Sequence, residues 1–481
     1  GYRVCDRQKS NLNRYSREAI ASRMLARRNF NADTLRELLE IALPMVISQG
    51  AFAVMIFTDR YFMSQIDPVH MAAALGGGVA CFFSFCFFSG LFSYANALAA
   101  QYLGAEEKHK CTRVVTQGWI MTVACIPILA AITFLVSDIF SAMDHDPVQV
   151  ELERIYYQIL MLGIVVTLAK ICLSSYFAGI GKSKVVMICD VCGLVLNVPL
   201  AYAMVFGHFG FPALGIVGAG ISTMVATIFS FLLFLGFFLE RTHREEFAVI
   251  EAFSLETGIL KRFLRLGFPS GVELFLNVAA FNLFLLMFQS YGVVEGASAA
   301  IVFNWDLLSF VPLIGLNIGM ISLIGRFVGA RDLQRADEVV TAGFVIGLTY
   351  SAVLAGLYIV FRFPLVEIFA PPEGDFTEIR NLAGFMMVGL SSYAMADAVI
   401  QVTGGVLRGA GDTRWLMVAS VSLHWAMLVA QYFIIRVFEL GPKVAWLAFV
   451  ALIFAIAGGF VIRLRGERWR DEEALARVMA E

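Results

Sequence analysis

Three polar side chains recur at helical spacing inside one long apolar run of the chain. Tyr393, Asp397 and Gln401 stand four residues apart, so an α-helix would carry all three on one face. A carboxylate between a phenol and an amide is rich in oxygen and suits a hard cation. The same pattern also fits a polar contact between two helices that binds nothing. Because an ionisable group in an apolar run is costly, its default interpretation is functional, and Asp397 is the first candidate for a cation or proton site.

A second set of polar residues follows a proline. Glu273 and Asn277 stand four and eight residues after Pro269, which again places them on one helix face. Asp306 lies near the middle of the next apolar run, where a binding role and a structural, hydrogen-bonded role both stay open. From these acids we predict that Asp397 and Glu273 are the ligands of a Na⁺ ion, if the bound ion is Na⁺.

Other ionisable residues in the apolar runs have weaker claims to function. Asp59, in FTDRYF, lies near the end of its run, where it could simply pair with Arg60. Asp190 stands only a few residues inside its run, so solvation at the interface is the favoured interpretation. We expect Lys170 to extend its ammonium group towards lipid headgroups. His424 is more typical of a packed, hydrogen-bonded histidine than of a proton carrier.

The apolar runs that hold these residues dominate the chain. Of its 481 residues, 59% are hydrophobic and only 15% are charged, whereas a soluble protein carries about 25% charged residues. Runs of membrane-spanning length recur throughout, which indicates a polytopic membrane protein in a lipid bilayer. The net charge of −2 and the lack of a basic, aromatic region argue against a nucleic-acid partner.

Several motifs that would indicate other chemistry do not occur in the sequence. There is no GxxxxGK[ST] motif, so ATP is not the predicted energy source, and there is no HExxH or GxSxG motif of a membrane hydrolase. Cys189 and Cys192 have CxxC spacing but no second CxxC and no nearby His, so we interpret them as small apolar residues. We therefore predict neither an enzyme nor a cofactor.

Twelve spanning helices account for the apolar runs. Their predicted ranges are 38–62, 69–99, 112–137, 154–178, 185–206, 213–239, 263–291, 297–325, 337–361, 379–405, 415–437 and 443–464. The terminal segments and the even-numbered connections hold 29 of the 36 Lys and Arg residues. By the positive-inside rule, both termini are predicted to be cytoplasmic.

The chain contains two copies of one pattern. Three landmarks recur in the same order, the first two at an offset of 225 residues and the third at 230. The landmark pairs are Pro44 and Pro269, Gly104 and Gly329, and Gly181 and Gly411. Each copy has six helices, and because six is even, the copies cross the membrane in the same direction, as a parallel repeat.

This repeat predicts a domain organisation with two lobes facing one another. The predicted parts are a cytoplasmic N-terminal segment 1–36, an N-lobe 37–240, a cytoplasmic linker 241–262, a C-lobe 263–465 and a cytoplasmic tail 466–481. Two equivalent lobes enclose a central space that can open to either side of a membrane. The glycine pairs near 181 and 411 are interpreted as tight turns between helices.

Six stretches together resemble the multidrug and toxic compound extrusion (MATE) family of cation-coupled antiporters. They are LPMVISQGAFAVMIFTDRYF, AQYLGAEEKHK, GIGKSK with NVPLAYAMVFG, GIVGAGISTMVA, SFVPLIGLNIGMISLIGRFVGARD and ADAVIQVTGGVLRGAGDTR. They occur in the order typical of the family and cover nearly all of residues 35 to 465, with the pattern of the bacterial NorM-like branch. The resemblance implies a twelve-helix, two-lobed exporter of organic cations.

The resemblance also implies roles for residues of the N-lobe. Asp59 stands where the family has an acid of the N-lobe cation or proton site. Asn197 and Thr223 match two polar residues of that site. Ala201, however, stands where the branch that uses this site fully has a second acid, which shifts the expected coupling site towards the C-lobe.

In the C-lobe the resemblance is incomplete. Asp397 matches a functional acid of the NorM-like branch, but Asn277 stands where that branch has another acid. Glu273, one helical turn earlier, is the candidate to replace it. Supporting or cleft-lining roles are expected for the remaining polar candidates, which are Tyr393, Gln401, Asn277, Asn197, Thr223 and Asp306.

The predicted function is therefore secondary antiport, in which small organic cations leave the cell in exchange for Na⁺ or H⁺. The coupling acids are expected to be Asp397, Glu273 and Asp59. A monomer in the plasma membrane, specifically a bacterial inner membrane, is expected. Two alternatives stay open: a flippase for lipid-linked intermediates of the same superfamily, which would have a more cationic cleft, and, with less support, an intramembrane enzyme.

Overall fold

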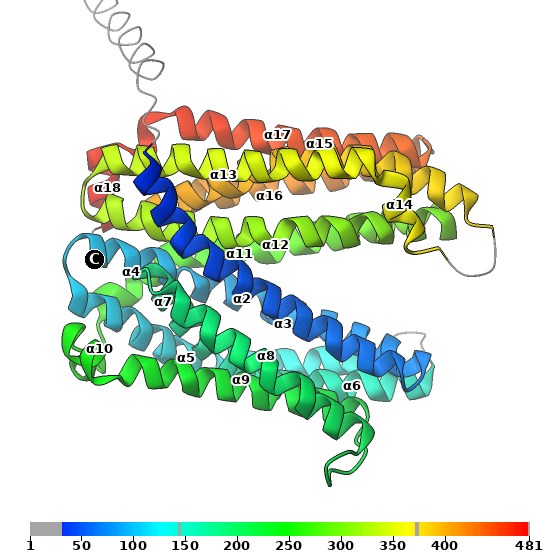
Figure 1. The fold of residues 1–481 in the computed structure, drawn as a ribbon, viewed down its shortest axis with the longest axis horizontal. Helices are drawn as coiled ribbons and strands as arrows, with labels where there is room; N and C mark the ends of the chain where they lie inside the picture. The colour runs from blue at the N-terminus through cyan, green and yellow to red at the C-terminus, as the bar shows by residue number, and fades with distance from the viewer. Residues whose placement is uncertain (1–30, 143–145, 371–374, 480–481) are drawn as a thin grey trace, which may run out of the picture.

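The computed structural model describes residues 31–142, 146–370 and 375–479, and every regular element in these ranges is a helix (Figure 1). The long helices of the first half are α2 (Ala32–Ser64), α3 (Pro68–Ser93), α4 (Ala95–Gly104), α5 (Lys108–Ala142), α6 (Pro147–Leu162), α7 (Ile164–Gly179), α8 (Ser183–Phe206) and α9 (Ile216–Leu239). Those of the second half are α11 (Thr257–Gln289), α12 (Val293–Gly329), α13 (Leu333–Val360), α15 (Thr377–Ala410), α16 (Thr413–Tyr432) and α17 (Pro442–Arg465). The short elements are α10 (Arg241–Glu246), η1 (Ile250–Ala252), α14 (Arg362–Glu367), the π-helical turn η2 (Phe433–Val437), η3 (Glu467–Trp469) and α18 (Glu472–Met479). Most of the predicted N-terminal segment, residues 1–30, lies outside the described residues.

Within the described residues, eleven stretches are long and apolar enough to span a membrane by themselves, with α3 and α4 acting as one stretch. The helices α6 and α7 form a twelfth span that is bent by 46° where Gly163 separates them. A Cβ atom on Gly163 would lie 3.1 Å from Met224 Cγ of α9, so the bend brings these helices close together. The all-helical, twelve-span prediction is confirmed.

Apolar side chains divide these helices into two lobes, the N-lobe (α2–α9) and the C-lobe (α11–α17), which form separate layers in Figure 1. The largest apolar cluster is built mainly from α3 to α9, whereas two other clusters are built mainly from α11 to α17. The lobes meet where α2 and α4 pack on α12 and where α3 packs on α11.

Two helices cross from one lobe to the other at the repeated prolines. Before Pro44, the side chains of α2 pack in a C-lobe cluster, to which Leu38 and Ile41 belong. Before Pro269, the side chains of α11 pack in the N-lobe cluster, to which Phe263 and Leu266 belong. A proline inside a helix removes one backbone hydrogen bond and favours a bend. Each proline therefore stands where its helix leaves one lobe for the other.

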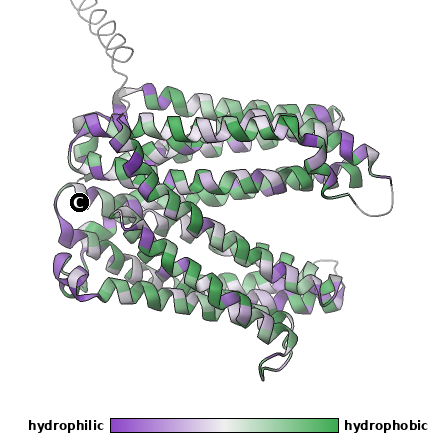
Figure 2. Ribbon diagram, in the orientation of Figure 1, coloured by the Kyte–Doolittle hydropathy of each residue, from purple (hydrophilic) through white to green (hydrophobic). Residues whose placement is uncertain are grey.

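One end of the bundle, here called the basic end, carries the tail helix α18, the linker helix α10 and the end of α4 (Figure 1). The first described helix begins and the last one ends there (Figure 1). Towards the opposite end, here called the far end, the ribbons of the two lobes diverge (Figure 1). Figure 2 shows hydrophobic residues along the middle of the helices and hydrophilic residues gathered at both ends, as expected for a protein surrounded by lipid.

Hydrogen bonds join the two lobes near the basic end. Gln101 Nε2 on α4 donates to the carbonyl of Gly409 at 2.7 Å. Asn96 Nδ2 donates to the carbonyl of Ile318 on α12 at 3.3 Å, and Ser322 Oγ donates to Asn96 Oδ1 at 2.9 Å. These bonds hold α4 against α12 and α15, so the lobes are closed on one another at this end.

The second repeated landmark explains how closely α4 and α12 approach. A Cβ atom on Gly104 would collide with the backbone of Arg326, and one on Gly329 would collide with the backbone of Gln101. Each glycine therefore serves as the contact surface for the other lobe. This reciprocal contact is what a two-fold repeat produces when its two copies face one another.

Candidate functional site

A buried acid of the N-lobe is held by neutral polar partners. Asp59 on α2 is only 6% exposed, and its Oδ2 accepts a hydrogen bond from Thr223 Oγ1 of α9 at 2.7 Å. Asn197 Nδ2 of α8 approaches the same hydroxyl at 3.4 Å. The neighbouring Arg60 is exposed and makes no ion pair with Asp59 in the described residues. The three residues that the family resemblance singled out therefore form one cluster.

Two oxygen atoms of this cluster have no partner. Asp59 Oδ1 and Asn197 Oδ1 are buried and accept no hydrogen bond from the described residues. An unpaired carboxylate oxygen in an apolar interior is costly unless a proton or a cation occupies it. The arrangement can therefore hold a proton or a small cation between α2 and α8.

The C-lobe brings two acids together. Asp397 on α15 and Asp306 on α12 are partly buried and interact electrostatically with one another. The ring of Tyr393 is 1% exposed, and its hydroxyl interacts electrostatically with Asp306 but makes no hydrogen bond in the described residues. Neither acid has a basic partner in the described part of the chain. Two carboxylates that interact in this way repel one another when both are charged, and a bound proton or cation relieves the repulsion.

Gln401, the third residue of the predicted face, contributes its backbone to a contact between helices. The backbone carbonyl of Gln401 accepts a hydrogen bond from Asn317 Nδ2 of α12 at 2.6 Å. This bond fixes α15 against α12 about one helical turn from Asp397 and about three turns from Asp306. The helical spacing of Tyr393, Asp397 and Gln401 could not indicate that Asp306 of the neighbouring helix interacts with Asp397.

Glu273 has a basic partner instead of an open coordination position. Its Oε1 accepts from Arg408 Nη2 at 2.8 Å, and the side chain of Glu273 is 5% exposed. The second oxygen, Oε2, is buried and unpaired. Electrostatically, Glu273 is also close to His424, whose Nδ1 faces the Ser420 carbonyl at 2.8 Å. Arg408 belongs to the second glycine turn, so this turn supplies a charge to the lobe interior.

The predicted second ligand of a Na⁺ site therefore lies in a different environment from the first. Asp397 has Asp306 as its neighbour, whereas Glu273 has Arg408. Asn277, one turn beyond Glu273, donates to Ser420 Oγ at 2.8 Å. Within the described residues no group of three His, Cys, Asp or Glu side chains is arranged to hold a metal ion.

The structure corrects the expectations for two charged residues of the N-lobe. Lys170 Nζ lies 3.0 Å from Asp190 Oδ1, and the other oxygen of Asp190 accepts from Ser48 Oγ at 2.5 Å. Lys170 does not extend to headgroups, and Asp190 is not solvated at the interface. The side chains are only 21% and 14% exposed, because pairing removes the need for water.

A signal in the sequence could have predicted this pair. The turn between α7 and α8 contains Gly181, and Lys170 and Asp190 stand at nearly equal distances before and after it. Two helices joined by a tight turn run antiparallel, so residues equally far from the turn face one another. No comparable local signal links Asp306 with Asp397 or Glu273 with Arg408, which lie on helices far apart in the sequence.

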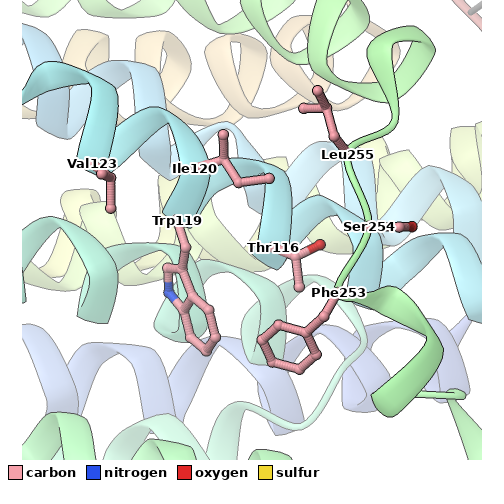
Figure 3. A pocket seen from close by; sticks show the side chains of 7 residues that line it. All are labelled: Thr116, Trp119, Ile120, Val123, Phe253, Ser254 and Leu255. Carbon is pink, nitrogen blue, oxygen red and sulfur yellow. The ribbon is translucent and has the colours of Figure 1, made fainter.

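A separate, apolar pocket of about 390 Å³ lies at the surface between α5 and the linker (Figure 3). Its lining residues are Thr116, Trp119, Ile120, Val123, Phe253, Ser254 and Leu255. None of the buried acids lines it. The pocket is therefore distinct from the polar sites inside the lobes.

Two lobes of spanning helices, each with an unpaired acid in its interior, define a multi-pass membrane transporter. The MatE family model matches residues 44–203 and 269–433, once in each half, and its two matches begin at Pro44 and Pro269. The chain belongs to the MatE family.

Known relatives and structures agree with this family. The chain is 28% identical over 442 residues to the probable multidrug resistance protein NorM of Pasteurella multocida, covering 89% of this chain and 93% of that protein. It is 26% identical over 452 residues to the multidrug resistance protein MdtK of Yersinia pseudotuberculosis, covering 92% and 97%.

Among solved structures, a MOP superfamily transporter from Pyrococcus furiosus has a TM-score of 0.83 at 18% identity, covering 92% of this chain and 98% of that one. A MATE protein in complex with MaL6 has a TM-score of 0.82 at 18% identity, covering 94% and 98%. At this level of identity the likeness concerns the fold, which the two lobes share with these transporters.

Proposed function

We propose that this multidrug-type transporter is a secondary antiporter that exports organic cations in exchange for Na⁺ or H⁺. The observation that carries the proposal is the pair Asp306 and Asp397, two acids that interact electrostatically within the membrane-spanning part of the C-lobe and have no basic partner among the described residues. Such a pair needs a cation or proton to neutralise it. It therefore provides the differential binding of a coupling ion that antiport requires.

Asp306 takes the place of the acid that the NorM-like pattern has where this chain has Asn277. Asn277 is used in a hydrogen bond to Ser420, and Glu273 is used in an ion pair. The second carboxylate of the proposed ion site thus comes from α12 and not from α11. The phenol of Tyr393 completes an oxygen-rich set at this place.

We assign the basic end to the cytoplasm, in accordance with the positive-inside rule. The inter-lobe bonds of Gln101 and Asn96 lie at that end, so with this assignment the closed side of the proposed transporter is the cytoplasmic one. In the proposed cycle, an ion that enters from outside neutralises the acids and favours release of the organic cation. Loss of the ion to the cytoplasm restores the negative charge that attracts the next organic cation.

The balance of buried charge favours cationic cargo over a lipid-linked anionic cargo. Among the described residues, Lys170 and Arg408 are each paired with an acid, Asp190 and Glu273, and the buried Arg262 lies at the basic end, at the seam between the lobes. The acids that are left without a basic partner give the interior a negative character. A flippase for anionic intermediates would need the opposite arrangement.

Purified protein in vesicles tests the proposal, with Na⁺ and pH gradients imposed separately and a fluorescent organic cation as cargo. Accumulation of the dye that follows one of the gradients supports antiport. Accumulation that is independent of both gradients would exclude it. The variant Asp306→Asn should lose the gradient dependence together with Asp397→Asn, since both remove the same pair.

A further inference from the structure

The segment that follows the last spanning helix is anchored on the C-lobe. Trp469 is 2% exposed within a C-lobe apolar cluster, and its Nε1 donates to the Leu464 carbonyl at 2.8 Å. Arg470 forms an ion pair with Asp337 of α13 at 2.5 Å. Leu475 packs against the same cluster. The start of the tail is therefore fixed to one lobe by a buried indole and a charge pair.

The end of the same segment is attached to the other side of the inter-lobe seam. Val478 packs against the N-lobe cluster, and its carbonyl accepts from Arg262 Nε at 3.0 Å. Arg262 Nη2 lies 3.1 Å from Met479 Sδ. Arg262 stands in the part of α11 that packs on the N-lobe, before the crossing at Pro269. Within about ten residues, the tail thus passes from the C-lobe to the N-lobe.

Arg262 joins this tail to the seam between the lobes. Its Nη2 also donates to Gln101 Oε1 at 2.5 Å, and Gln101 in turn donates to the Gly409 carbonyl at 2.7 Å. One chain of hydrogen bonds therefore runs from the tail through Arg262 and Gln101 to the C-lobe turn. Gly411 of that turn lies against Val478, and a Cβ atom there would collide with the valine side chain.

The environment of Arg262 shows that its buried position depends on contact with the tail. The side chain is 1% exposed, its guanidinium lies 4.8 Å from the Tyr102 ring, and Nη1 has no hydrogen-bond acceptor. No carboxylate in the described residues pairs with it. A buried guanidinium that has only neutral acceptors is costly, and water would readily replace the tail as its partner. The buried state of Arg262 therefore depends on the tail remaining in place.

We propose that residues Trp469–Met479 are a strap that closes the basic end of the transporter, with Arg262 as its clasp. The strap spans the two lobes where Gln101 joins them, so the lobes cannot separate at this end while both of its ends stay attached. Separation of the lobes requires Val478 to leave Arg262 and Gly411. Once freed, the guanidinium is hydrated at the opened mouth, which stabilises the open state.

Hydrogen–deuterium exchange of the purified full-length protein tests this proposal without any transported ligand. The test variants are a chain ending after Arg470, which keeps the Trp469 anchor, and the point variant Val478→Ser. The readout is exchange in peptides covering 98–104 and 321–329, the two sides of the seam. Exchange there should rise roughly tenfold in the shortened chain, which lacks the acceptors of Arg262, and by a smaller factor in Val478→Ser, which keeps the backbone carbonyl and loses only the side-chain packing.

A matched control separates the strap from a general loss of helix α18. Arg477→Ala alters the residue next to Val478. Among the described residues, the Arg477 side chain pairs only with the exposed Glu473. This variant should exchange like the parent. Unchanged exchange at the seam in both test variants would overturn the proposal. Raised exchange throughout α6 and α9 as well would also count against it, because a strap acts only at the basic end.

Discussion

The two lobes share a scaffold but not their chemistry. At the 225-residue offset of the repeat, the counterpart of Asp59 is Phe284, which is fully buried and stacks on Phe449 with ring centroids 4.7 Å apart. At the 230-residue offset, the counterpart of Asp397 is Thr167, whose hydroxyl donates to the carbonyl of Gly163, the residue just before its own helix. The repeated residues, prolines and glycines, set how helices cross and approach. The acids are particular to each lobe.

The two acid sites also differ in kind, which suggests different tasks. The N-lobe site holds one carboxylate with a hydroxyl and an amide, so a single proton satisfies it. The C-lobe site holds two carboxylates and a phenol, so it retains negative charge after one proton has bound. A site of the second kind is better suited to a metal cation or to an organic cation. The C-lobe is therefore the place where ion and cargo are expected to compete.

The largest effect is expected for Asp397→Asn. The substitution keeps the shape of the side chain and removes its charge, so the protein should insert and fold. Dye accumulation in vesicles should fall to the level of vesicles without protein. Glu378→Gln, at the exposed start of the same helix α15, is the control and should transport normally. Transport of Asp397→Asn with parental ion dependence would move the coupling site to the N-lobe.

Asp59→Asn should give a smaller effect that distinguishes the two sites. Because Thr223 can still donate to an amide oxygen, the cluster should keep its geometry. The transport rate should fall while any Na⁺ dependence is retained, since that dependence is assigned to Asp306 and Asp397. Rates measured across a series of Na⁺ concentrations check this. Equal loss of Na⁺ dependence in Asp59→Asn and Asp397→Asn would show that the two lobes share one ion site.

The sequence predicted the arrangement of spanning helices better than it predicted which side chains pair with the buried acids. Twelve spans followed from apolar length, and the two-fold repeat followed from landmarks such as Pro44 and Pro269, because both depend on local sequence. The resemblance to the family placed Asp59, Asn197 and Thr223 together, and the structure agrees. The partners of the remaining acids depend on which helices meet in space. No spacing in the sequence brings α12 beside α15 at the height of Asp397.

The ion pair of Lys170 and Asp190 should behave as a structural element of the N-lobe only. Asp190→Asn leaves an ammonium group without a counter-charge in a largely buried place and should reduce the free energy of unfolding by on the order of 3 kcal/mol. The double variant Lys170→Met with Asp190→Asn should recover most of this loss. Thermal unfolding in detergent measures both. An unchanged midpoint for Asp190→Asn alone would show that the pair contributes little.

The two repeated turn glycines offer a matched test of the C-lobe turn. Gly181 and Gly411 have φ values of +80° and +87°, so an alanine at either position is strained by about 1 kcal/mol. A Cβ atom on Gly181 meets no atom within 4 Å, whereas one on Gly411 meets Val478. Gly411→Ala should therefore be destabilised by about 1 kcal/mol more than Gly181→Ala. Equal unfolding midpoints for the two variants would show that Val478 moves away from the added methyl group without loss of stability.

The smallest effect is expected in the linker, where a buried histidine contacts the N-lobe turn. His243 of α10 is 2% exposed, with Nδ1 3.0 Å from Lys182 Nζ and Nε2 3.0 Å from the Tyr176 hydroxyl. An ammonium group can only donate, so Nδ1 must accept and the imidazole is neutral with its proton on Nε2. Burial first, and then the charge of Lys182, lower the pKa of His243 from 6.5 to about 4; nearby Glu246 opposes the shift only in part.

Because the pKa of His243 is lower in the closed linker than in an opened one, only the opened form binds a proton between pH 6.5 and about 4. The stability of the closed linker should therefore be constant above pH 6.5 and fall below it, by about 1 kcal/mol at pH 5.5. Hydrogen exchange of residues 241–256, corrected for the intrinsic effect of pH, measures this fall. In the C-lobe turn the corresponding contact is an ion pair, Asp412 with Arg463 at 2.7 Å, which contains no imidazole.

In His243→Phe, which keeps the aromatic packing and has no titrating group, the corrected exchange should no longer change between pH 7 and pH 5.5. If that variant kept the full pH response, another group would be responsible for it.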